Sequence, residues 1–435
     1  MLMFKTTHHF VLFTVGLLAS SAVHGQEFEQ EPIRYSQATP DNCVTRFFDE
    51  VAAGKKSLEY EEGTGYLRSL LAGLEVPQSS QMLVFSKTSL QRHRIAPRTP
   101  RAIYFNDEVY VGACVEGDVL EISAVDPQLG AVFYTLDQEP LERPVVRRQT
   151  DNCLICHGSS QTKEIPGHVV RSVFADASGL PILSSGTYRI DHTSPLEKRW
   201  GGWYVTGTHG EQKHLGNLIV RQRGDTEIDN IAGQNRTSLD GLCDTSQLLT
   251  PHSDIVALMV LEHQADAHNY LTRASHLTRQ AMHYQATLNK ELGEPASRVW
   301  DSTKSRIKSA CEPLVEYLLF SEEAVLSDPI KGTSGFADEF AKLGPQDRLG
   351  RSLRQLDLTQ RLFKYPCSYL VYSPSFAALP AEARDYLLRR MHEVLSGEDQ
   401  SLKFAHLSSD DRTAILDILR DTIPELPEYW QPSGP

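Results

Sequence analysis

The sequence lacks a long apolar run after its first 25 residues, and it contains no internal repeat and no low-complexity tract. A transmembrane helix needs about 20 consecutive apolar residues, so we expect no stable membrane span in the rest of the chain. The lack of repeats argues against a repeat array. The remaining residues, about 410, are too many for one ordinary hydrophobic core, so we expect two or three packed units.

Basic residues are the minority among the charged ones, with 43 Lys and Arg against 56 Asp and Glu. Lys5 is the only charged residue before Glu27, so loss of residues 1–25 would change the net charge from −13 to −14. An acidic surface argues against nucleic acid and anionic membranes as partners. It is compatible with a basic partner protein.

Cysteine is scarce, with seven residues, and no second Cys-x-x-Cys pair exists to complete a four-cysteine zinc site. Two of the seven lie in Cys153-Leu154-Ile155-Cys156-His157, which has the pattern of a c-type haem attachment sequence. In that pattern each thiol adds across one haem vinyl group and the histidine ligates the iron. The alternatives are a redox cysteine pair or half of a zinc site. We predict one covalent haem c held by Cys153 and Cys156, with His157 as the proximal iron ligand.

The N-terminus has the pattern of an export signal. An apolar run, 10–18, follows Lys5 and precedes the small residues 19–22, with cleavage expected after Ala22 or Gly25. The alternative is a retained N-terminal anchor. We therefore predict a signal peptide over 1–25 and a periplasmic protein, because c-type haem is attached outside the bacterial cytoplasm. That compartment permits disulfides, but the sequence does not choose between bridges and buried thiols for Cys43, Cys114, Cys243, Cys311 and Cys367.

Alternating and apolar runs predict an α+β fold in three parts after the signal peptide. The first part, 26–137, is β-rich; the second, 138–249, bears the haem and contains short strands; the third, 250–435, is a helical bundle. Strands are expected at 82–85, 102–105, 109–113, 119–122 and 131–134, and then at 168–174, 203–205 and 218–220.

The third part begins with a long amphipathic helix. Thr250 is the expected cap and Pro251 suits the first position, while apolar residues recur at spacings of four and three as far as Leu288. Gly293 and Pro295 should end the helix. Further helices are expected at 298–320, 334–343, 346–364, 380–396 and 409–421, with a kink or break at Pro313.

The sixth iron ligand is left open between a methionine, a second histidine and no stable ligand. His263 lies on the apolar seam of the long helix, and Met259 lies one turn earlier on nearly the same face. Either residue is a candidate distal ligand. The alternative is a core histidine bonded to a neighbouring polar group, beside a packing methionine.

A second histidine cluster, His209 and His214, is a candidate for iron, another metal or proton transfer, or else a solvated loop. His168 and His192 are further candidates. Haem propionates need cations or strong donors, and several such residues lie in the same segment: Arg171, Arg189, Arg199, Trp200, Trp203 and Tyr204.

The motif 153–157, together with the export signal, resembles the c-type cytochrome superfamily. The stretches 199–207, 250–263 and 361–370 resemble a group of large exported proteins of environmental bacteria described as containing a cytochrome c domain. The resemblance implies haem and electron transfer. It implies no substrate and no functional residue beyond the motif.

We therefore expect a mono-haem c-type protein that transfers electrons to an unidentified redox partner. The chain is about four times the size of a small carrier domain, which leaves room for a docking surface or a substrate pocket. The alternative is a haem-dependent oxidoreductase, a peroxidase or small-molecule oxidase, with a displaceable sixth ligand. A second attachment motif, as in di-haem peroxidases, is absent. The third possibility is a binding or sensing module in which haem reports a gas or redox state; we see no output domain for it in the sequence, though a separate partner could provide one.

Overall fold

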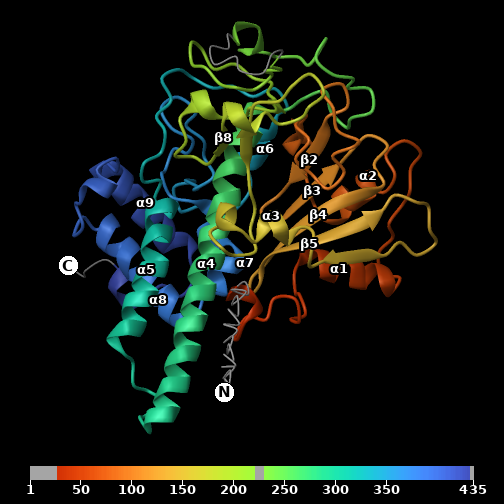
Figure 1. Cartoon of the computed structure of the whole chain (residues 1–435). Coiled ribbons are helices and arrows are strands. Elements are labelled where there is room, and N and C mark those ends of the chain that lie inside the picture. Colours follow the sequence, from red (N-terminus) through yellow and green to blue (C-terminus); the bar gives the residue numbers. More distant parts are fainter. Residues whose placement is uncertain (1–26, 221–229, 432–435) are drawn as a thin grey trace, which may run out of the picture.

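A computed structural model describes residues 27–220 and 230–431, so the predicted signal peptide over 1–25 lies outside the described residues. The fold is α+β, with an antiparallel sheet towards the N-terminus and a helical region towards the C-terminus. Figure 1 shows the sheet on one side, the helical region on the other, and the long helix α4 (Ile255–Leu292) between them. The short helix α3 (Leu154–His157) lies between α4 and the sheet in this view.

The main sheet has seven antiparallel strands in the order β6-β5-β4-β3-β2-β1-β9. Its strands are β1 (Met82–Val84), β2 (Arg101–Phe105), β3 (Val109–Ala113), β4 (Val119–Asp126), β5 (Gly130–Asp137), β6 (Val146–Gln149) and β9 (Trp203–Tyr204). The predicted strands from 82 to 137 are confirmed. Because β6 and β9 come from the segment 138–249, the sheet extends across the boundary that the sequence suggested at residue 137.

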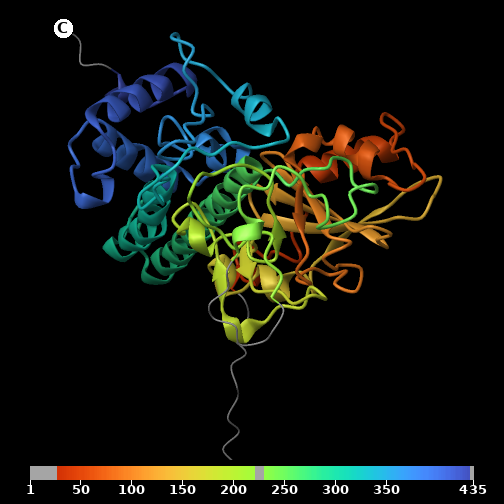
Figure 2. The same cartoon turned by 90° about the horizontal axis from the view of Figure 1, so that it is seen from above.

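The two faces of this sheet have different partners. Leu120 and Ile122 of β4 point into a core shared with α1 (Cys43–Ala52) and α2 (Leu67–Gly73). Alternate residues point the other way, and Ser123 there contacts His168. Figure 2 shows the red and orange helices on the opposite side of the sheet from the yellow segment that contains α3. The motif therefore lies on the face of the sheet opposite α1 and α2.

A separate two-stranded hairpin, β7 (Arg171–Val173) and β8 (Thr187–Arg189), follows α3. β7 lies inside the predicted strand at 168–174. Residues 218–220, also predicted as a strand, contribute only one isolated bridge, between Val220 and Asp176. The described part of the segment 138–249 is mostly irregular.

The helix α4 begins four residues later than the sequence suggested. Asp254, not Thr250, is the cap, and its carboxylate accepts bonds from the amides of Val256 and Ala257. Just before the cap, the hydroxyl of Ser253 accepts a bond from the amide of Leu83 in β1 and donates to the carbonyl of Tyr204 in β9. Gly293 ends the helix in the left-handed region, at φ 67°, as predicted.

Five further helices follow α4 in the described chain: four pack beside it, and the last packs on one of those four. They are α5 (Asp301–Leu318), α6 (Phe336–Ala341), α7 (Pro374–Ala377), α8 (Ala381–Leu395) and α9 (Ser409–Thr422). α5 is continuous through Pro313. The predicted helix at 346–364 is wrong: Asp347 and Asp357 bond to amides just after them and form turns instead. Among the described helices, none is apolar over enough of its length to cross a membrane.

Candidate haem-attachment site

The motif residues lie on and next to one helical turn. Cys153 precedes α3, and its carbonyl accepts bonds from the amides of Cys156, at 3.3 Å, and His157, at 2.9 Å. Neither thiol is in a disulfide; Cys153 is half-buried and Cys156 is exposed. Burial, reinforced by the carboxylate of Glu121, raises the pKa of Cys153 to about 11. The turn therefore presents two thiols and one imidazole within five residues.

The imidazole of His157 has a defined orientation. Its Nδ1 lies 2.9 Å from the carbonyl oxygen of Gly167, and because a carbonyl can only accept, Nδ1 must carry the proton. Nε2 is then the nitrogen with the free lone pair. The ring packs against Phe133 of β5, with centroids 4.7 Å apart, and burial lowers the pKa of His157. A neutral imidazole with Nδ1–H bonded to a carbonyl is the form that ligates metals.

A charged pair on the sheet lies beside the motif. Arg101 of β2 and Glu121 of β4 form an ion pair of 2.7 Å whose side chains are mostly buried, and both act electrostatically on Cys153 and His157. Nε of Arg101 is buried without a hydrogen-bond partner among the described residues. Glu121 already compensates the charge of Arg101, so what Arg101 offers a haem propionate is the unused Nε–H donor. The sequence analysis did not single out Arg101. The one feature that could have pointed to it is a lone charged residue in an otherwise apolar strand.

The six propionate candidates divide into two groups. Arg199 forms a fully buried ion pair with Glu262 and donates to two backbone carbonyls, so its charge is already compensated. Trp200, Trp203 and Tyr204 are buried. Arg171 and Arg189 remain partly exposed on the hairpin β7–β8, and Arg189 reaches the carbonyl of Gln161 just after the motif, at 3.4 Å.

Among the described residues, no hydrogen bond or ring contact joins His263 to His157. Both nitrogens of His263 are used: Nδ1 lies 2.8 Å from Nδ1 of His192, and Nε2 lies 2.8 Å from the hydroxyl of Ser368. His263 is fully buried against aromatic rings. These contacts favour the interpretation as a core histidine.

Met259 is buried in the same core cluster. α4 comes close to the attachment site at Asn269, whose side chain bonds to His168, the residue after Gly167. At 1.5 Å per residue, His263 lies about 9 Å and Met259 about 15 Å from Asn269 along the helix.

The other histidines serve the local structure. His209 and His214 have ring centroids 4.6 Å apart, and each ring accepts a bond from a nearby backbone amide. Burial lowers the pKa of His214 to about 3. His168 lies closest to the motif: its Nε2 is 2.7 Å from the hydroxyl of Ser123, and its Nδ1 is buried without a partner among the described residues.

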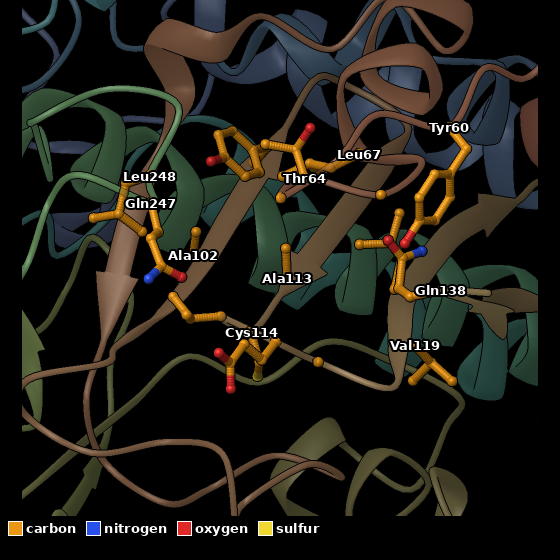
Figure 3. Close-up of a pocket in the computed structure, with 17 residues that line it drawn as sticks. Tyr60, Thr64, Leu67, Ala102, Ala113, Cys114, Val119, Gln138, Gln247 and Leu248 are labelled. Atoms are coloured by element: carbon orange, nitrogen blue, oxygen red, sulfur yellow. The ribbon is translucent and has the colours of Figure 1, made fainter. Parts of the chain in front are cut away.

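Two other kinds of site, a metal cluster and a ligand pocket, bear on the described ranges. No three His, Cys, Asp or Glu side chains converge there as a metal site would require, and the five cysteines outside the motif are free thiols. A pocket of about 290 Å³ lies on the opposite face of the sheet from Phe133, close to the smallest size typical of ligand sites. Figure 3 shows Cys114, Tyr60 and Gln138 around it. No motif residue lines this pocket.

Comparisons with protein families, curated proteins and solved structures give no match to the chain.

Proposed function

We propose that the chain binds one haem c through Cys153 and Cys156, with His157 as an axial ligand, and that it transfers electrons in the periplasm. The observation that supports this best is the bond from Nδ1 of His157 to the carbonyl of Gly167, on a turn with two unpaired thiols. A bound haem would supply reversible one-electron oxidation and reduction. This proposal also accords with the cytochrome resemblance of the motif.

The protein's residues would hold the cofactor at the surface. Gly167 orients the imidazole, Phe133 supports its ring, and Arg101 offers an unused Nε–H donor for a propionate. Cys156 and Ile155 are exposed, Ile155 to 73%. A partner protein could therefore approach the attachment turn directly. The acidic net charge favours a basic redox partner.

A haem-dependent oxidoreductase is the second candidate, and one observation favours it. Both distal ligands suggested by the sequence, His263 and Met259, are packed in the core some distance along α4 from the segment that contacts His168. An iron without a protein ligand on its second face can bind a small molecule there. Cyanide and carbon monoxide distinguish the two functions: a carrier with a stable sixth ligand ignores them, whereas an oxidoreductase binds them with a change in its visible spectrum.

The first experiment is expression of the full chain with its export signal in a host that matures c-type cytochromes. We expect a mass increase of one haem and a pyridine haemochrome spectrum of a c-type haem. Cys153→Ser with Cys156→Ser should abolish both. The matched control, Cys43→Ser with Cys114→Ser, replaces two half-buried cysteines outside the motif and should retain haem. A parent protein with the mass of the bare polypeptide and no Soret band would overturn the proposal.

A further inference from the structure

Asn269 of α4 connects the long helix to the peptide that orients His157. Its Oδ1 accepts the bond from the amide of His168, and its Nδ2 donates to the carbonyl of the same residue, both at 2.8 Å. One side chain thus satisfies both backbone groups of His168. Asn269 is 1% exposed, so both bonds lie in a place where an unpaired polar group is costly.

Gly167 is held to His157 through both its amide and its carbonyl group. Its amide donates to the carbonyl of His157 at 2.8 Å, while its own carbonyl accepts from Nδ1 of His157 at 2.9 Å. A Cβ at residue 167 would lie only 2.3 Å from Oδ1 of Asn269. Glycine is therefore required for the close approach of α4, and the approach in turn holds the Gly167 carbonyl against the imidazole.

A buried carboxylate on α4 holds the side-chain amide of Asn269 in place. Its Nδ2 also donates to Asp266 at 3.1 Å, one turn earlier on α4. Asp266 is buried and pairs with Lys163 at 3.3 Å and Arg189 at 3.5 Å, two cations from the segments that follow the motif. The amide of Asn269 thus has one orientation only, because Asp266 can accept a bond but cannot donate one when ionised.

We propose that Asn269 is a positioning residue for the haem ligand: by holding the 167–168 peptide, it fixes the tautomer of His157 and strengthens Nε2 as an iron donor. The proposal rests on the proposed function. An imidazole whose N–H is bonded to a carbonyl is more basic at its other nitrogen, and loss of such outer contacts typically weakens metal sites about 10–100-fold. Asn269 touches neither thiols nor imidazole, so it acts only through Gly167 and His168.

The test compares Asn269→Ala with Asn289→Ala. Asn289 is the matched control: it is a buried asparagine on the same helix with two side-chain bonds, to Arg298 and Trp300, 20 residues further along. In the haem-bearing protein, Asn269→Ala should favour the ferrous state about tenfold, a rise in reduction potential of about 59 mV. Asn289→Ala should leave the potential at the parent value. Asn269→Ser keeps a small polar group without adding a charge, and it serves if Asn269→Ala does not fold.

A second readout does not require haem. In the full chain with Cys153→Ala and Cys156→Ala, nitrogen NMR should show His157 protonated at Nδ1, and Asn269→Ala should give a mixture of tautomers. A fixed Nδ1–H in the Asn269 variant, or a potential that moves no more than in Asn289→Ala, overturns the positioning role. Absence of haem from the parent chain overturns the proposed function instead, and the tautomer measurement keeps the two failures apart.

Discussion

At the scale of single residues, substitution of His263 tests whether this residue packs in the core or ligates the iron. His263→Ala removes a ring whose two nitrogens are bonded and leaves the partner groups on His192 and Ser368 unsatisfied. We expect a loss of about 2–4 kcal/mol in the free energy of unfolding, measured in denaturant. The visible spectrum of the haem-bearing protein should match that of the parent. Met259→Ala is the parallel variant, and a new axial-ligand spectrum in either would identify that residue as the distal ligand.

The same scale shows which part of the candidate site the sequence could predict. Cys153, Cys156 and His157 are contiguous, so a local pattern contains them. Arg101, Gly167 and Asn269 are brought to the motif by strand register and by the packing of α4, and no local spacing encodes those contacts. Conversely, the sequence made His263 a candidate ligand because it is a polar residue on the apolar seam of the long helix. Its two polar partners are 71 and 105 residues away in the chain, so sequence could not reveal them.

At the scale of elements, prediction succeeded where a pattern is local. The strands from β1 to β5 alternate clearly or run apolar, and α4 has a long periodic seam. β6 was missed because it is an edge strand with two arginines and little burial. The predicted helix at 346–364 failed because aspartate side chains bond to backbone amides in turns, an alternative that periodicity does not reveal.

The end of α4 offers a test at this scale. Gly293 has a φ of 67°, and a Cβ there would meet no atom within 4 Å. Gly293→Ala should therefore cost about 1–2 kcal/mol in the free energy of unfolding through backbone conformation alone. Gly293→Asn should cost less, because asparagine adopts this region more readily. Equal stability of the parent and both variants in urea unfolding would contradict this account of how the helix ends.

At the scale of the whole molecule, buried histidines should control stability against acid. Burial lowers the pKa of many of them, among them His168, His192, His214, His263, His268 and His276. In the unfolded chain a histidine binds a proton near pH 6.5. Below that pH the unfolded state therefore binds more protons than the folded state, and stability falls as the pH falls.

The pKa falls to about 3 for His214 and His276 and to about 4 for His268. At pH 5 each of these three should cost about 2 kcal/mol relative to pH 7.5, a combined loss comparable to the whole stability of many domains. The histidines outnumber the four described carboxyls whose pKa burial raises, and which oppose this effect: Glu108, Glu262, Asp266 and Glu323. We therefore expect cooperative acid unfolding between about pH 4 and pH 6, followed by circular dichroism. His276→Gln should move the midpoint to lower pH, since it removes one protonation site; an unchanged midpoint would assign the acid sensitivity to other groups.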